Sequence, residues 1–223
     1  METRPEELTL AERYRFLIGA IVPRPIALVS TISTDGLPNL APFSFFNGIG
    51  SNPMTVLFCP GNHPDGSEKD TLKNAKPETE GGVGEFVINL AVEKYAREVS
   101  GASEPLPRDE SEFELTGLEM APSVAVRPPR VAASPIAFEC KTIQVIRTNP
   151  GVPAAGNVVM GEVVHLYAQD SLVNKRMQVD PEVLRAIGRM GGLGYTTTRD
   201  RFEMPRGQAA LDIPHPFSGN DGR

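Results

Sequence analysis

Lys69, Asp70 and Thr71 are the residues with the clearest capacity to bind an anion. They fall at the start of a predicted short helix, for which Ser67 or Asp70 is the expected N-cap. The free N–H groups of a helix N-terminus and the ammonium of Lys69 both attract phosphate, and the Thr71 hydroxyl can add a hydrogen bond. Asp70 is better suited to capping the helix than to contacting an anion. Taken alone, the segment also fits an ordinary capped surface helix.

The histidines and cysteines form no recognisable metal site. His63, His165 and His215 are far apart, and neither Cys59 nor Cys140 belongs to a Cys-x-x-Cys pair, so we expect no metal. Both cysteines lie in apolar runs, which predicts reduced thiols packed in a core. The sequence also lacks a glycine-rich dinucleotide motif, a phosphate-binding loop of the NTPase type and a Gly-x-Ser-x-Gly nucleophile motif.

The overall charge argues against a nucleic-acid partner. The 22 Lys and Arg residues and 28 Asp and Glu residues give a net charge of −6, and 40% of the chain is hydrophobic. Nucleic-acid-binding domains are normally basic. The acidic first residues do not resemble a signal peptide, and no apolar run approaches the roughly 20 residues that a membrane-spanning helix needs. We therefore expect a cytoplasmic protein with no membrane association.

Composition favours a β-rich domain in which turns are frequent. The chain holds 21 Gly and 21 Pro residues without a collagen-like repeat. One domain over residues 14–205 is expected, with an N-terminal arm, 1–13, and a C-terminal arm, 206–223. The pattern of β-branched and apolar residues predicts strands at 26–33, 37–44, 54–59, 85–90, 136–147 and 158–168. Short helices are expected near 69–74 and 91–100, and after Asp180, ending at Gly188.

The first two strands define an expected hairpin at one edge of the sheet. Residues 26–33 are apolar on both faces, as in a strand that is buried on both sides. Asp35-Gly36 follows and predicts a type I′ turn, in which both central residues have positive φ. Pro38 and Pro42 cannot donate to a β-ladder, so the returning strand is expected at an edge or beside a bulge.

Residues 24–53, RPIALVSTISTDGLPNLAPFSFFNGIGSNP, closely resemble the flavin reductase-like family. This family comprises FMN-binding split-barrel proteins, among them flavoredoxins and the flavin reductases of two-component monooxygenases. The resemblance covers about residues 14–205. It continues, in order, through Lys69-Asp70-Thr71 with Asn74, residues 85–89, Pro129-Arg130, Ser134-Pro135, Glu139-Cys140, residues 161–164 and residues 188–195.

The resemblance implies an antiparallel split β-barrel, mainly β with short helices, that forms a homodimer and binds FMN near the dimer interface. The residues that it assigns to FMN binding are Ser30, Thr31, Asn39, Ala41, Pro42, Ser44, Asn47, Lys69, Asp70, Thr71 and Arg189. His165 and Tyr195 are the expected nicotinamide contacts.

Several of these assignments keep a structural alternative. The hydroxyls of Ser30 and Thr31 can instead bond within their own sheet, and Arg189 can be a surface residue. A single histidine on a strand, as at His165, is more often structural. Phe45 and Phe46 are left out of the site, because adjacent phenylalanines more often belong to a core.

The activity that the resemblance implies is transfer of a hydride from NADH or NADPH to flavin. The cofactor performs this chemistry, so no catalytic side chain is expected. The alternative is a non-catalytic FMN-binding electron carrier of the flavoredoxin type. Partners would be a small-molecule flavin and a nicotinamide, together with a monooxygenase or an electron-acceptor protein.

Overall fold

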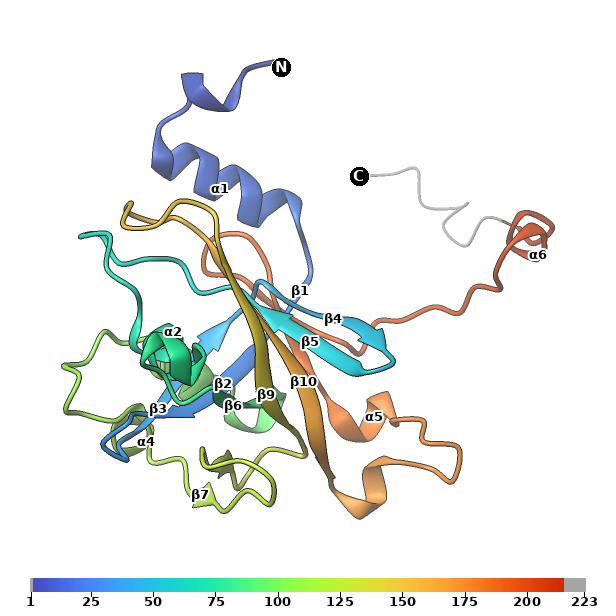
Figure 1. The fold of residues 1–223 in the computed structure, drawn as a ribbon. Helices are drawn as coiled ribbons and strands as arrows, with labels where there is room; N and C mark the ends of the chain where they lie inside the picture. The colour runs from blue at the N-terminus through green and yellow to red at the C-terminus, as the bar shows by residue number, and fades with distance from the viewer. Residues whose placement is uncertain (1, 215–223) are drawn as a thin grey trace.

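The computed structural model describes residues 2–214, and a seven-stranded antiparallel sheet forms its centre (Figure 1). The strand order is β3-β2-β6-β9-β10-β5-β4. These strands are β2 (Ala27–Ile32), β3 (Pro38–Phe43), β4 (Phe46–Ser51), β5 (Met54–Phe58), β6 (Glu85–Leu90), β9 (Ile136–Arg147) and β10 (Asn157–Ala168). The outer strands β3 and β4 are not paired with each other, so the described residues do not form a closed barrel.

Two small sheets and several short helices surround the central sheet. β1 (Arg24–Pro25), β11 (Ile187–Arg189) and β12 (Tyr195–Thr197) form one small sheet, and β7 (Met120–Ala121) pairs with β8 (Arg130–Val131). The α-helices are α1 (Leu10–Ala20), α2 (Asp70–Ala75), α3 (Ala96–Gly101), α4 (Glu112–Thr116), α5 (Pro181–Leu184) and α6 (Gln208–Leu211). Four 3-10 turns occupy Pro5–Glu7, Glu78–Glu80, Glu93–Tyr95 and Asp170–Leu172. The expectation of a mainly β domain with short helices is confirmed.

Both faces of the sheet carry a buried core. On one face, Leu28 and Leu40 pack with side chains of α3 and α4. On the other, Val29 packs with Phe58 and Phe86, whose ring centroids are 5.1 Å apart. The predicted burial of β2 on both sides is therefore confirmed.

A glycine allows one of these rings to lie against β10. A Cβ atom at Gly161 would come within 2.4 Å of the Phe86 ring, so any larger residue would displace the aromatic side chain.

The hairpin between β2 and β3 differs from the predicted type I′ turn. Gly36 has a φ of 89°, but Asp35 is not among the residues with positive φ, which a type I′ turn requires. Instead, Ser33 and Leu37 close a longer loop, with Ser33 N–H donating to the Leu37 carbonyl at 2.9 Å. The edge position that Pro38 and Pro42 predict for β3 is confirmed.

Strand β4 was not expected, because its sequence, FNGIGS, has two glycines and little β-branched character. It forms by pairing with β5 along most of its length. The other expected strands are present, and β6 and β9 have the predicted bounds.

The predicted helix ends need correction in three places. The helix expected over 91–100 is an α-helix only from Ala96 to Gly101, preceded by the 3-10 turn at Glu93–Tyr95. The helix after Asp180 stops at Leu184, where Arg185 takes the left-handed conformation with φ 48°, and Gly188 lies in β11 instead of ending a helix. At α2 the N-cap is Lys69, which makes no side-chain capping bond, and not Ser67 or Asp70.

The expected arms are not simple extended segments. α1 begins at Leu10, inside the expected N-terminal arm, and continues to Ala20. Thr9 caps it, since its hydroxyl accepts from Glu12 N–H while the Glu12 carboxylate accepts from Thr9 N–H at 2.8 Å. α6 lies in the C-terminal arm, of which residues 215–223, including His215, lie outside the described residues. Across residues 2–214, every helix is too short or too polar to cross a membrane.

Candidate functional site

A cavity of about 560 Å³ lies between α1, the end of β3 and the loop that joins β9 to β10. Its size falls within the range of roughly 300–1,000 Å³ that is typical of small-molecule sites. The residues that line it are Leu10, Arg13, Tyr14, Leu17, Pro42, Phe43, Ser44, Phe45, Cys59, Gly61, Asn62, Lys69, Ala154 and Gly156. α1 lies beside the tip of the β9–β10 hairpin in Figure 1, which agrees with this lining.

The lining has a positive charge that no lining carboxylate balances. Arg13 and Lys69 both face the cavity, and no Asp or Glu among the described residues belongs to its wall. Among residues 2–214, neither cation forms an ion pair. The rest of the wall is mainly apolar. In a chain of net charge −6, such a cavity is suited to a ligand that has an apolar body and an anionic group.

Arg24 organises one side of this cavity, although it does not line it. Its side chain is buried, and its Nε donates to the Oγ of Ser44 at 3.2 Å. The same guanidinium donates to the carbonyls of Ile18 and Ile21, the latter at 2.8 Å, and to that of Met190 at 3.1 Å. Burial lowers the pKa of Arg24, and the nearby charge of Arg189 adds to this. Arg24 thus joins three parts of the chain: the end of α1, Ser44, and the glycine-rich loop between β11 and β12, residues 190–194.

Pro42 and Ser44 are the two residues of the 39–47 segment, among those predicted from sequence, that line the cavity. Ala41 is half-buried and packs against the core around Phe58. Asn47 is exposed on β4, where its Oδ1 accepts from Gly48 N–H at 2.9 Å. The structure therefore brings Pro42, Ser44 and Lys69 together and leaves Ala41 and Asn47 outside the cavity wall.

Four further predicted residues take part in bonds inside the fold. Asn39 donates to the hydroxyls of Thr31 and Thr71, at 3.2 and 3.0 Å, and Asn74 donates to Thr31 at 3.1 Å. Ser30 donates to the Pro129 carbonyl at 2.5 Å. The bonds of Asn39 and Asn74 hold α2 against β2 and β3. Their effect on the cavity is to fix the position of Lys69, the residue just before α2.

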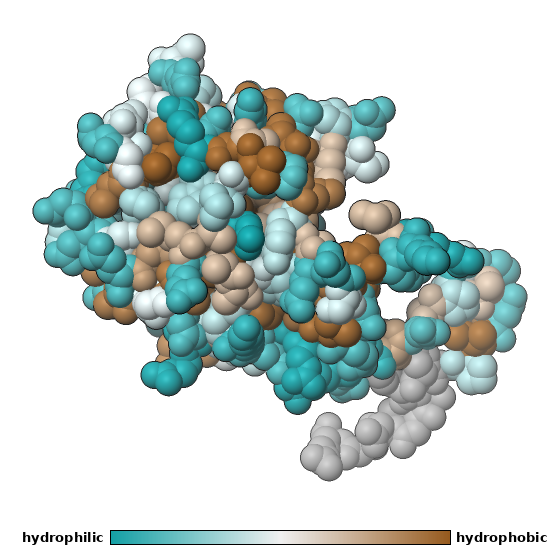
Figure 2. All heavy atoms as spheres, turned by 90° about the horizontal axis from the view of Figure 1, so that it is seen from below, coloured by the Kyte–Doolittle hydropathy of each residue, from teal (hydrophilic) through white to brown (hydrophobic). Residues whose placement is uncertain are grey.

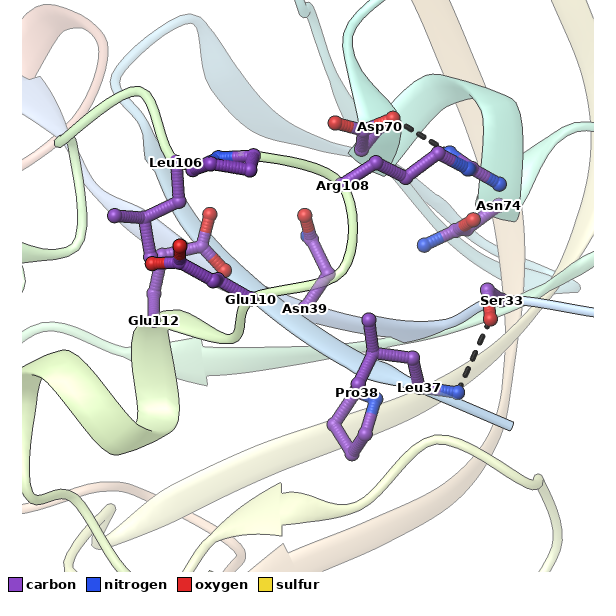
Figure 3. A pocket seen from close by; sticks show the side chains of 11 residues that line it. Ser33, Leu37, Pro38, Asn39, Asp70, Asn74, Leu106, Arg108, Glu110 and Glu112 are labelled. Carbon is purple, nitrogen blue, oxygen red and sulfur yellow. Dashed lines mark hydrogen bonds and ion pairs between the residues drawn. The ribbon is translucent and has the colours of Figure 1, made fainter. Parts of the chain in front are cut away.

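Asp70 faces away from the large cavity and toward a pocket of about 20 Å³ (Figure 3). It forms ion pairs with Arg108, at 2.5 Å, and with Lys73, at 3.1 Å. Burial alone would raise the pKa of Asp70, but these hydrogen bonds and charges hold it below its ordinary value. Opposite it, Glu112 accepts from Leu40 N–H at 2.8 Å, and burial raises the pKa of Glu112. The pocket has room for about one water molecule.

Arg189 and Tyr195 contact each other at the glycine-rich loop. The Arg189 guanidinium lies 4.6 Å from the centre of the Tyr195 ring and donates to the Gly192 carbonyl at 2.9 Å. Neither residue lines the cavity, but their loop is joined to it through the bond from Arg24 to Met190.

His165 belongs to a different group of side chains. Its Nδ1 is 3.3 Å from Oε1 of Glu139, which faces it across the β9–β10 pair. The Glu139 carboxylate is 1% exposed and accepts from the backbone N–H groups of Val124 and Ala125. Beside it, the Arg130 guanidinium lies 3.9 Å from the centre of the Tyr167 ring. None of these residues lines the cavity within one chain.

Sequence reasoning missed the contribution of α1 and of Arg24. A signal for α1 was present in the pair Thr9 and Glu12, a capping box, and in the spacing of Leu10, Tyr14 and Leu17 along one helix side.

Cys59 was expected in a core with Cys140, but it is only half-buried and lines the cavity. Burial raises the pKa of both thiols. Both cysteines are free.

Comparison with known proteins identifies a family and several relatives. Residues 19–183 match the model of the flavin reductase like domain. An uncharacterized protein of Halalkalibacterium halodurans is 39% identical over 92% of this chain and 96% of its own length. The crystal structure of nitrilotriacetate monooxygenase component B from Bacillus cereus superposes with a TM-score of 0.84 at 31% identity, covering 92% of this chain and 98% of that one. The crystal structure of the 2-nitrobenzoate 2-nitroreductase NbaA of Pseudomonas fluorescens superposes with a TM-score of 0.81 at 29% identity. The match covers 97% of this chain and 100% of that one.

Proposed function

Because the chain belongs to the flavin reductase-like family, we propose that it is an oxidoreductase that binds FMN and receives a hydride from NADH or NADPH. The observation that carries the proposal is the cavity whose wall holds Arg13 and Lys69, mainly apolar residues and no carboxylate. A mainly apolar wall suits the flavin ring, and two free cations suit a dianionic phosphate. The sheet with unjoined outer strands is compatible with the split barrel that the sequence suggests.

Lys69 is the proposed contact to the FMN phosphate. Its side chain brings a full positive charge to the cavity and has no carboxylate partner within residues 2–214. α2 is only six residues long, so this role rests on the ammonium group and not on the dipole of the helix. Asp70 and Thr71 act indirectly in this proposal, since both hold α2 in place.

Pro42 and Ser44 are the proposed contacts to the flavin ring. Because the Oγ of Ser44 accepts from Arg24, its own proton remains available to donate into the cavity. Arg24 thereby sets the direction of that hydrogen bond. Ser30, Thr31 and Asn39 have side chains committed to other bonds, and we propose that they support the site from beneath.

FMN, when bound, supplies the hydride acceptance and electron transfer of the reaction. The protein's residues contribute binding, orientation and exclusion of water. Lys69 neutralises charge at one end of the cavity, Ser44 donates a hydrogen bond, and Pro42 and Phe45 present apolar surface. No side chain is required to move a proton, which agrees with a cavity wall that has no His, Asp or Glu residue.

A homodimer is the proposed assembly. β9 and β10 expose several large apolar side chains, namely Ile143, Ile146, Val164 and Leu166, each at least 39% exposed. Hydrophobic patches also interrupt the hydrophilic surface that is seen from below in Figure 2. His165 and Tyr195 do not line the cavity of their own chain, so we propose that either residue reaches the nicotinamide from a second copy.

Anaerobic addition of NADH or NADPH to the flavin-loaded protein tests the activity. Loss of the flavin absorbance band at ~450 nm supports the oxidoreductase. Absence of bleaching by either nucleotide, in protein that dithionite does bleach, would instead favour an electron carrier of the flavoredoxin type. A protein that binds no flavin would contradict both.

The two solved relatives suggest different uses for the reduced flavin. Likeness to monooxygenase component B favours delivery of reduced flavin to a partner monooxygenase. Likeness to the 2-nitroreductase favours reduction of a nitroaromatic compound at the same site. Gel filtration after reduction separates them: free reduced flavin in the small-molecule fraction supports delivery, and reoxidation by 2-nitrobenzoate while flavin stays bound supports the nitroreductase.

A further inference from the structure

We propose that Arg13, on α1, is a specificity-determining residue that gives the cofactor phosphate a second cation beside Lys69. The inference rests on the proposed FMN site and deepens it. It makes α1 part of the cofactor site, although sequence reasoning had placed Arg13 in a terminal arm.

The first observation is that Arg13 and Lys69 share one cavity while coming from different elements. The wall of that cavity offers neither of them a carboxylate. A phosphate monoester carries close to two negative charges at neutral pH, so one ammonium group leaves about one charge uncompensated. A second cation in the same cavity supplies that charge.

The second observation concerns the orientation of Arg13. Its Nε donates to the Leu8 carbonyl at 3.0 Å, which directs the side chain back along the start of α1. The two terminal nitrogens form no ion pair with a carboxylate in the described part of the chain. A guanidinium group with free terminal nitrogens can donate two parallel hydrogen bonds to a phosphate.

The third observation is that α1 is held as a wall of the cavity and is hardly part of the core. Ile18 is its one buried residue, whereas Leu10, Tyr14 and Leu17 are exposed and line the cavity. The Thr9–Glu12 cap stabilises the first turn of the helix itself, and the bonds from Arg24 to carbonyls tie the end of the helix to β1. Arg13 lies in the first turns of α1, whose far end is tied to Arg24.

Arg15 provides a matched comparison on the same helix. It has the same charge and is also exposed, but it does not line the cavity. General electrostatic attraction between α1 and an anion would involve both arginines. A direct phosphate contact would involve Arg13 alone.

The test measures FMN and riboflavin dissociation constants for the wild-type protein and for Arg13→Ala, Arg15→Ala and Lys69→Ala by quenching of flavin fluorescence. Riboflavin lacks the phosphate, so it reports on ring binding and on the integrity of α1. Arg13→Ala is expected to weaken FMN binding about tenfold, as loss of one charged hydrogen bond would. Riboflavin binding by this variant, and FMN binding by Arg15→Ala, should change less than twofold.

Three results would overturn the inference. FMN binding by Arg13→Ala that equals wild type, with Lys69→Ala impaired, would leave the FMN site valid without a role for Arg13. Equal losses of FMN and riboflavin in Arg13→Ala would show an effect through α1 itself. Equal losses of FMN in Arg13→Ala and Arg15→Ala would show unspecific attraction. Failure of the wild-type protein to bind either flavin would instead contradict the proposed function.

Discussion

Nε of Arg24 lies 3.2 Å from Oγ of Ser44, and this bond connects a buried cation to the wall of the candidate cofactor cavity. Within residues 2–214 the arginine faces carbonyl oxygens and pairs with no carboxylate, so its charge is compensated by dipoles at the end of α1 and in the glycine-rich loop. One side chain thereby sets the place of α1, of Met190 and of Ser44 together.

Replacing Arg24 should lower the free energy of unfolding and also loosen α1 beside the cavity. Arg24→Met leaves buried carbonyls without donors, so the free energy of unfolding should fall by about 2–4 kcal/mol in urea titrations. Hydrogen exchange should become faster in α1. Arg97→Met, at an exposed position of α3, is the control and should change neither measurement. Unaltered exchange in α1 would show that the arginine does not hold the helix.

Lys69→Ala should separate phosphate binding from ring binding. Loss of a charged hydrogen bond corresponds to roughly 1.5–3 kcal/mol, so FMN affinity should fall about 10- to 100-fold while riboflavin affinity barely changes. Fluorescence titration with both flavins measures this. Lys94→Ala, which removes an exposed lysine outside the cavity, should leave both affinities unchanged. A parallel loss for both flavins would place the effect in folding of the α2 region.

The ion pairs of Glu68 should make the free energy of unfolding fall as the pH becomes acidic. Burial alone would raise its pKa, but hydrogen bonds from Arg147, at 2.7 Å, and Lys76, at 3.2 Å, hold the pKa below 4.5. A carboxyl group with a lowered folded-state pKa stabilises the protein above its unfolded pKa and loses this contribution as the pH falls. Glu68→Gln should therefore lower the free energy of unfolding by about 1 kcal/mol at pH 7.

The difference between Glu68→Gln and wild type should shrink as the pH falls below 4.5 toward the folded-state pKa. Urea unfolding at several pH values measures it. Glu114→Gln, at an exposed position of α4, serves as the control. A difference that stays constant with pH would mean that the substitution acts through packing.

Light scattering should give about twice the 24.1 kDa mass of one chain. Ile146→Lys places a charge on the exposed apolar surface of β9 and should shift the protein toward monomer, because burying an unpaired charge in an interface is unfavourable. Leu115→Lys, at an exposed apolar position of α4, should leave the mass unchanged. A wild-type monomer would refute the dimer, and a monomer that still transfers a hydride from NADH or NADPH would refute the nicotinamide contact from a second copy.

Local sequence pattern predicted most strands because they are long and rich in β-branched residues. β9 and β6 have the expected bounds for this reason, whereas the glycines of β4 conceal a strand that only its pairing with β5 defines. The type I′ prediction failed because it rested on Asp35-Gly36 alone. The loop is closed by a backbone bond between Ser33 and Leu37, and the identity of the two central residues does not determine that bond.

The sequence predicted those residues of the candidate site whose chemical type alone suggests a role in binding. Lys69, Pro42 and Ser44 were singled out and do line one cavity. Thr31 and Thr71 carry equally suitable hydroxyls, but the position of Asn39 between them decides that they bond inside the fold. Arg13 reaches the cavity because Arg24 holds the end of α1 beside it. Arg24 also bonds to Met190, far along the chain, and a contact between distant residues produces no pattern in the neighbouring sequence that could predict it.

The weak burial of α1 bears on how long a ligand stays bound. Since Ile18 is its one buried residue, swinging the helix away from the cavity exposes little additional apolar surface. The residence time of a flavin in the proposed site should then depend on the bonds from Arg24 that tie the end of α1 to β1, and little on the packing of the sheet. Changes to Arg24 offer a way to convert a tightly held cofactor into an exchangeable one, or the reverse, while the core on the two faces of the central sheet stays untouched.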